Sequence, residues 1–235
     1  MRLSLANFAY ALMHPWEALQ YLRKNDVIPE TSIARYLPSN PIILEAGAHN
    51  GTDTLRMASF WPAAQIHAFE PVPGAYSELF ARAIEHRTRI HCYPCGLGPN
   101  KGKMLMHVSG DGSAGSCQSS SLLPPSKNNS DEYSFVSFGK HIDIEVTSID
   151  EWAQKQGVDR VDFMRLDMQG YEIEALKGAE HTLKSTSAIQ LEVSHIPLYQ
   201  GAPLYAEVKT WMAERGFRPA VKAVFRVGGN VLFVR

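Results

Sequence analysis

A short apolar run that ends in an acid and two spaced glycines constrains this chain more than any other feature. Residues 42–51 read IILEAGAHNG, and residues 52–60 continue with helical spacing of apolar side chains. This pattern is typical of a buried strand that turns sharply into a helix, because glycine tolerates positive φ angles and leaves room for a close neighbour. The N–H groups of the first helical turn lack partners within the helix. Open α/β sheets bind nucleotide-like ligands at such a turn.

The glycine spacing indicates which ligand to expect. A dinucleotide-binding turn carries Gly-x-Gly-x-x-Gly and places a pyrophosphate at the helix N-terminus. This chain has Gly47 and Gly51 but lacks the middle glycine, and its strand ends in Glu45. A carboxylate at that position repels a pyrophosphate and suits a cation. S-adenosylmethionine carries a sulfonium and an ammonium and has no phosphate, so we expect it to be the cofactor.

A second acid stands at the end of the next expected strand. Residues 65–71 read QIHAFEP, and Pro71 ends the strand because proline cannot donate to the ladder. An acid such as Glu70, about 20 residues beyond the glycine turn, accepts hydrogen bonds from ribose hydroxyls in dinucleotide folds. Many α/β proteins have glycines after strands and acids at strand ends. The order and spacing of the two features together nevertheless favour an adenosine-binding site.

The bulk composition is that of one globular domain. The chain has 235 residues, of which 45% are hydrophobic and 20% charged, enough for an α/β domain with a full core. A net charge of −1 gives no overall attraction to nucleic acid, so we expect no nucleic-acid partner. Three cysteines are too few for a disulfide framework, and no segment has the length and apolarity of a transmembrane span. We therefore expect a cytoplasmic protein.

Residues 1–40 are expected to form an N-terminal helical extension. Prolines at positions 15, 29 and 38 break it into two or three short helices. The extension has three open roles: it covers the active site, packs on a partner, or contacts a membrane surface as an amphipathic helix. Residues 41–235 are expected to form the enzyme domain.

From residue 41 onward the pattern predicts a doubly wound α/β sheet, because strands alternate with helices. Parallel strands are expected over 42–46, 65–70, 89–93, 161–167 and 188–193, and a C-terminal antiparallel hairpin over 217–227 and 230–234 turns at Gly228 and Gly229. Helices are expected over 52–60, 74–87, 148–155, 171–183 (with a break at Gly178) and 203–215. The result is a mostly parallel sheet of seven strands.

One stretch departs from this alternation. Two further strands are expected over 103–108 and 142–146, and residues 96–98 are expected to form a turn. Residues 109–130 are rich in Ser, Gly, Asn and Pro. Such a stretch is typical of a long mobile loop that serves as a lid or binding loop. A disordered surface insertion is the alternative.

Six short segments resemble the FkbM-type family of S-adenosylmethionine-dependent methyltransferases. They are EAGAHNG (45–51), FEP (69–71), SSSL (119–122), LDMQGYE (166–172), LKGA (176–179) and LE (191–192). The resemblance implies a class I methyltransferase fold, which is Rossmann-like. It also implies O-methylation of a hydroxyl on a sugar, a glycan or glycolipid precursor, or a natural product. Family members usually have Asp where this chain has Glu45, and Asp-Val-Glu-Gly where it has DMQG (167–170).

The carboxyl ends of parallel strands face one crevice, which groups the expected site residues. We expect the cofactor to contact Glu45, Gly47, Ala48, His49, Asn50, Gly51, Thr54, Glu70, Pro71, Cys95, Gly96, Leu97 and Asp167. We expect the methyl acceptor, a small-molecule or glycan hydroxyl, to contact Ser119, Ser120, Ser121, Gln169, Tyr171 and Glu172.

Methyl transfer to a hydroxyl benefits from a general base. His195, just after the fifth parallel strand, is the first candidate because its ordinary pKa lies near neutrality. Glu192 either orients His195 or acts as the base itself, and Asp167 binds the cofactor ammonium or faces the acceptor. A loop histidine without a special role is nearly as compatible with the sequence. The same three residues suggest a magnesium site, but no Asp-Asn pair follows Asp167, and we expect no required metal.

Two other functions remain open at this point. An NAD(P)-dependent oxidoreductase has the same type of fold but needs the middle glycine that this chain lacks. A non-catalytic protein of the same fold would bind S-adenosylmethionine without transferring the methyl group. The sequence predicts neither the acceptor nor the oligomeric state.

Overall fold

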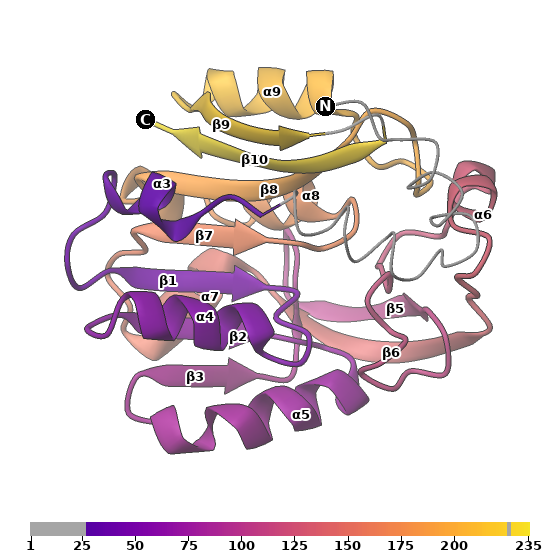
Figure 1. Cartoon of the computed structure of the whole chain (residues 1–235), viewed down its shortest axis with the longest axis horizontal. Coiled ribbons are helices and arrows are strands. Elements are labelled where there is room, and N and C mark those ends of the chain that lie inside the picture. The colour runs from indigo at the N-terminus through magenta and orange to yellow at the C-terminus, as the bar shows by residue number, and fades with distance from the viewer. Residues whose placement is uncertain (1–26, 225–226) are drawn as a thin grey trace, which may run out of the picture.

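A seven-stranded sheet forms the centre of the computed structural model, which describes residues 27–224 and 227–235 (Figure 1). The strand order is β3-β2-β1-β7-β8-β10-β9. The five strands from β3 to β8 run parallel: β1 (Ile42–Ala46), β2 (Gln65–Phe69), β3 (Ile90–Tyr93), β7 (Phe163–Leu166) and β8 (Ala188–Ser194). Strands β10 (Gly228–Val234) and β9 (Arg218–Val224) add an antiparallel edge. The predicted sheet and C-terminal hairpin are confirmed.

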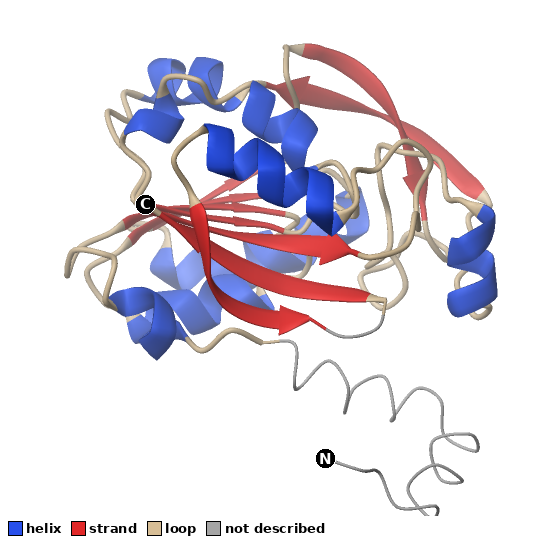
Figure 2. Cartoon of the chain, turned by 90° about the horizontal axis from the view of Figure 1, so that it is seen from above, coloured by secondary structure: helices blue, strands red, loops and turns tan. Residues whose placement is uncertain are grey.

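Helices cover both faces of this sheet (Figure 2). They are α3 (Glu30–Ala34), α4 (Thr52–Phe60), α5 (Pro73–Ala83), α7 (Ile149–Gln156), α8 (Glu172–Lys177) and α9 (Tyr205–Glu214), with 3₁₀ turns at Ile84–His86 and Thr182–Lys184. Successive side chains of a strand point to opposite faces. In β1, Ile43 therefore packs in one apolar cluster and Leu44 in another. Burial on both faces explains why the central strands read as continuous apolar runs.

The predicted break at Gly178 is also present. Helix α8 ends at Lys177, and a Cβ at Gly178 would lie 2.4 Å from the backbone oxygen of Gly98. Position 178 is therefore restricted to glycine, because the helix end rests directly on a neighbouring loop. Of the expected N-terminal helices, only α3 falls in the part of the chain that the structure describes, and those before residue 27 lie outside it.

A second, smaller sheet lies beside the carboxyl ends of the parallel strands (Figure 1). Its order is β4 (Gly96–Leu97), β6 (Lys140–Thr147) and β5 (Gly102–Val108). The prediction of a turn at 96–98 was wrong in part, because Gly96 and Leu97 pair in parallel with β6. The hairpin turn was also misplaced, because Gly228 and Gly229 both belong to β10. No helix of the described residues has the length and apolarity needed to cross a membrane.

The segment between β5 and β6, which we call the insertion (residues 109–139), is more ordered than its composition suggested. It contains helix α6 (Lys127–Glu132), and Ser121 forms a β-bridge with His107. Ser109, Ser120 and Ser121 are buried. Their hydroxyls form hydrogen bonds, for example from Ser121 Oγ to the backbone oxygen of Gln169 at 2.9 Å. The serines thus supply internal hydrogen bonds, and the segment is folded onto the domain, which corrects the interpretation as a disordered insertion.

Candidate active site

A cavity of about 450 Å³ lies over the carboxyl ends of β1, β2 and β7, and we call it the first cavity. Its wall combines the turns after these strands with the short strand β4 and part of the insertion. Predicted cofactor residues in its lining are Gly47, Ala48, His49, Asn50, Glu70, Pro71, Cys95, Gly96, Leu97 and Asp167. Segments far apart in the sequence therefore meet at the predicted edge of the sheet.

The β1–α4 turn needs glycine for two different reasons. Gly47 has φ +76°, and a Cβ there would lie 2.0 Å from the backbone oxygen of Asp167. Gly51 has φ +80° and precedes helix α4, where a Cβ would lie 2.8 Å from Leu79 Cδ1. Left-handed backbone and close neighbours both exclude larger residues. The turn after β1 is consequently packed directly against the turn after β7.

Glu70 directly follows β2, and backbone N–H groups hold its carboxylate. Its Oε2 accepts a hydrogen bond from the N–H of His49, and its Oε1 accepts one from the N–H of Val72, both at 2.8 Å. Burial raises the pKa of Glu70 to about 7, although the two N–H groups act in the opposite direction. Each carboxylate oxygen has a second acceptor site. Glu70 can therefore still accept hydrogen bonds from a ligand in the cavity.

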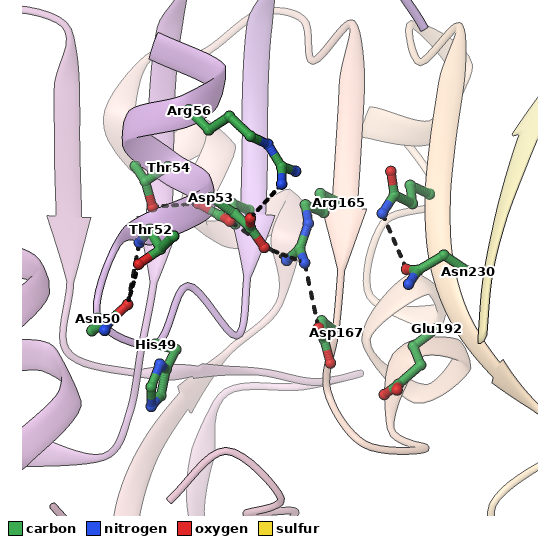
Figure 3. A network of polar contacts seen from close by, with 12 residues as sticks. His49, Asn50, Thr52, Asp53, Thr54, Arg56, Arg165, Asp167, Glu192 and Asn230 are labelled. Carbon is green, nitrogen blue, oxygen red and sulfur yellow. Dashed lines mark hydrogen bonds and ion pairs between the residues drawn. The ribbon is translucent and has the colours of Figure 1, made fainter. Parts of the chain in front are cut away.

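Arg165 is a site residue that the sequence did not reveal. It lies in β7 and forms ion pairs with Asp53 (2.6 Å) and Asp167 (3.4 Å) (Figure 3). A third ion pair joins it to Glu45 at 3.5 Å. Burial works against the charged guanidinium, but the surrounding carboxylates shift its pKa upward overall. The signal available in the sequence was a basic residue inside an apolar strand, VDFMRLD (161–167), since arginine is rarely buried unless paired.

Three of the expected cofactor residues do not line the first cavity: Glu45, Gly51 and Thr54. Glu45 is fully buried and accepts a hydrogen bond of 2.5 Å from the hydroxyl of Thr54. Burial raises the pKa of Glu45 to about 7, and Arg165 opposes that shift. The structure thus places Glu45 behind the cavity wall, where it helps to hold Arg165 and helix α4.

Gln169 joins the acids at the ends of β7 and β8. Its Nε2 donates one hydrogen bond to Asp167 Oδ1 at 2.9 Å and another to Glu192 Oε2 at 2.6 Å. Its Oε1 lies 3.1 Å from the Tyr199 hydroxyl. Gln169 has φ +55°, an uncommon value for a residue with a side chain. The predicted grouping of Asp167 and Glu192 is therefore present (Figure 3). The neutral amide of Gln169 lies between the two carboxylates and donates to both.

A second cavity of about 680 Å³ lies between the insertion and the loop from β8 to α9. Gln118, Gln169 and Glu192 line both this second cavity and the first one. These three residues therefore form a wall that the two cavities share. A ligand in either cavity can reach the same side chains.

The predicted acceptor residues are divided between the two cavities. Ser120 and Tyr171 line the first cavity, Ser119 and Glu172 line the second, and Gln169 lines both. Ser121 lines neither, because its hydroxyl binds the turn after β7.

His195 lies away from both cavities. Its ring packs edge-on against Tyr205 of α9, with ring centroids 5.6 Å apart, and it lines neither cavity. Its backbone N–H donates to Val227 at 2.7 Å, where the chain leaves β8. Of the candidates for the general base, Glu192 lines both cavities and His195 lines neither.

Comparison with known proteins shows which family has this fold and this site. The sequence matches the methyltransferase FkbM domain over residues 45–219. The chain belongs to the FkbM methyltransferase family. The 2-O-methyltransferase NoeI of Sinorhizobium fredii is 32% identical over 166 residues, which cover 69% of this chain and 67% of NoeI. Methyltransferase sdnD of Sordaria araneosa is 27% identical over 218 residues, which cover 82% of this chain and 74% of sdnD.

Solved structures support the fold of this FkbM methyltransferase. The crystal structure of methyltransferase FkbM from Methylobacillus flagellatus KT superposes with a TM-score of 0.53 at 15% identity, covering 84% of this chain and 44% of that one. The present chain therefore spans less than half the length of that protein. Fibrillarin in its complex with Nop5p superposes with a TM-score of 0.50 at 16% identity, covering 85% of this chain and 74% of fibrillarin. The predicted family, fold class and methyltransferase activity are confirmed.

Proposed function

We propose that the first cavity binds S-adenosylmethionine and that the enzyme methylates a hydroxyl oxygen of a small molecule or glycan. The lining fits this cofactor in three respects. Glu70 offers acceptors for the ribose hydroxyls, Asp167 offers a carboxylate for the ammonium, and the segment from Cys95 to Leu97 offers a largely apolar surface for the adenine. The turn after β1 lacks the middle glycine of dinucleotide-binding turns, which disfavours a nicotinamide dinucleotide.

The proposed reaction depends on the position of Glu192. S-adenosylmethionine supplies a methyl group bound to a positively charged sulfur. Glu192 lines both cavities and accepts the proton of the acceptor hydroxyl as methyl transfer proceeds. Gln169 holds the Glu192 carboxylate through its 2.6 Å hydrogen bond, so that the base is fixed before the acceptor arrives. Well-oriented reactants gain up to about 7–11 kcal/mol from such positioning.

The name of NoeI, a 2-O-methyltransferase, supports oxygen as the methylated atom. The domain division is likewise a proposal: residues 41–235 form the methyltransferase domain, and residues 1–40 form an extension. Within the described part of the extension, Val27 lines the first cavity, and Ile28 and Ile33 pack in the core cluster that contains Ile43 of β1. Residues 27–40 thus contribute to the stability of the domain and to one wall of the proposed cofactor site.

Transfer of a labelled methyl group from S-adenosylmethionine to a panel of neutral glycosides and alcohols tests the reaction. In Glu192→Gln, we expect kcat to fall by about 10²–10⁴-fold, the usual contribution of a general base, with little change in cofactor affinity. Glu214→Gln is the matched control, since the Glu214 side chain is 66% exposed and lines neither cavity. A fully active Glu192→Gln enzyme would remove Glu192 as the base.

A further inference from the structure

The second cavity has an unusual balance of charge. Three carboxylates contribute to its lining: Glu132, Glu172 and Glu192. No Lys, Arg or His side chain of the described residues lines it. By contrast, the first cavity includes Arg56 and Arg165 in its wall. Binding sites for phosphate and carboxylate groups normally provide arginine, lysine or clustered N–H donors. An anionic ligand in the second cavity would instead meet the carboxylates of Glu132 and Glu192, together with the Glu172 carboxyl, whose pKa burial raises to about 7.

The rest of the lining of the second cavity is largely apolar. Val193, Ile196, Leu198 and Val208 line it on the side of β8 and α9, and Tyr133 and Phe135 line it on the side of the insertion. Apolar side chains with a few polar groups at one end are typical of sites for small organic ligands. Among its polar residues, the hydrogen-bonded pair Gln169 and Glu192 also lines the first cavity. A ligand whose polar group lies at this pair can place an apolar body along Val193, Ile196 and Leu198.

The Tyr199 side chain fixes the two sides of the second cavity relative to each other. Its hydroxyl donates to the backbone oxygen of Ser119 in the insertion at 2.7 Å and lies 3.1 Å from Gln169 Oε1. Ser126 Oγ and the backbone N–H of Ser126 also bind the β8–α9 loop, at Pro197 and Leu198. The cavity is therefore built between tied segments and is not a gap between independent loops.

We propose that the second cavity is the acceptor site and that it selects an uncharged amphiphilic acceptor. The hydroxyl to be methylated lies at Glu192, and the apolar body lies along Val193, Ile196 and Leu198. Alkyl and aryl glycosides have this chemistry. Sugar phosphates and nucleoside-diphosphate sugars do not, because their anionic groups would face the acidic lining. The proposal rests on the proposed methyltransferase reaction and specifies its substrate class.

The experiment compares hexyl β-glucoside with glucose 1-phosphate and uridine diphosphate glucose. Binding is measured by saturation-transfer NMR with S-adenosylhomocysteine present, and methyl transfer is measured as kcat/KM. We expect the neutral glycoside to bind at least about tenfold more tightly than either anionic compound, which corresponds to about 1.4 kcal/mol. In Leu198→Arg, a new cation at the wall should reduce or reverse this preference. Leu105→Arg is the matched control, because Leu105 is 50% exposed on β5 and lines neither cavity.

The possible failures are distinguishable. If S-adenosylhomocysteine binds but the anionic sugars bind equally well or better, the acceptor inference is overturned and the cofactor assignment stands. The acceptor inference is also overturned, and the cofactor assignment kept, if none of the three compounds binds. This conclusion also follows if Leu198→Arg and Leu105→Arg have the same preference as the unmodified protein. If neither S-adenosylmethionine nor S-adenosylhomocysteine binds, the proposed function itself is wrong, and the acceptor inference is overturned with it.

Discussion

Removal of the Arg165 guanidinium should destabilise the protein more than any surface substitution. In Arg165→Met, Glu45 would remain fully buried with the Thr54 hydroxyl as its hydrogen-bond partner. A pair at the Arg165–Glu45 distance of 3.5 Å attracts by about 5 kcal/mol at an effective dielectric constant of about 20. The cost of burying the guanidinium, which the substitution removes, offsets part of this. We therefore expect a loss of about 3–5 kcal/mol in the free energy of unfolding, as for other broken buried pairs.

Urea unfolding followed by tryptophan fluorescence at about pH 8, above the pKa of about 7 that Glu45 has in the unmodified protein, measures this loss. Arg160→Met is the control, because Arg160 pairs with Asp162 at 3.1 Å but its side chain is 46% exposed. Exposed pairs contribute about 0–1 kcal/mol. The double variant with Glu45→Gln should recover about 1–3 kcal/mol, since it removes the buried carboxyl that has lost its guanidinium partner. The reasoning is refuted if Arg165→Met is as stable as Arg160→Met, or if Glu45→Gln recovers nothing.

Three further results are expected. Gly47→Ala should reduce the free energy of unfolding by about 1–3 kcal/mol or prevent folding, because φ is +76° and the new Cβ would lie 2.0 Å from a backbone oxygen; a thermal melt identical to that of the unmodified protein contradicts this. His195→Ala should retain kcat within about threefold, because positions outside both cavities are not expected to affect proton transfer; a loss of a hundredfold or more would restore it as the base. Burial raises the pKa values of Glu45, Glu70 and Glu172 from the ordinary 4.5 to about 7, so the folded state binds more protons in this interval. These three carboxyls outweigh His67, whose pKa burial lowers to about 4 and which acts in the opposite direction. The free energy of unfolding should therefore fall as pH rises from about 5 to about 7, and a flat profile over that range argues against it.

The backbone architecture was largely predictable from the sequence because it depends on local patterns. Apolar runs of strand length, a helix after each of them and the glycine turn at Gly47 predict the parallel sheet. The rule that parallel strands end at one edge then brings Glu70, Asp167 and Glu192 together, as the structure confirms.

The details of the site depend on contacts between distant segments, which a single sequence does not specify. Ion pairs with carboxylates from β1, α4 and the end of β7 hold the Arg165 guanidinium in position. At the second cavity, a hydrogen bond from Tyr199 joins the β8–α9 loop to Ser119, 80 residues earlier in the chain. The position of His195 just beyond β8 was predictable, but the direction of its side chain was not, because the chain turns there and packs the ring on Tyr205.

Calorimetric titration with S-adenosylmethionine tests the central claim most directly. The unmodified protein should bind this cofactor and show no heat with NADH. Glu70→Ala should weaken the binding by about 10–100-fold, because hydrogen bonds to a charged group contribute about 1.5–3 kcal/mol. Glu78 lies on α5 and lines neither cavity, so it provides the control. The Glu78→Ala variant should bind S-adenosylmethionine as tightly as the unmodified protein. Equal affinity of Glu70→Ala and the unmodified protein, or binding of NADH in place of S-adenosylmethionine, would contradict the assignment of the first cavity.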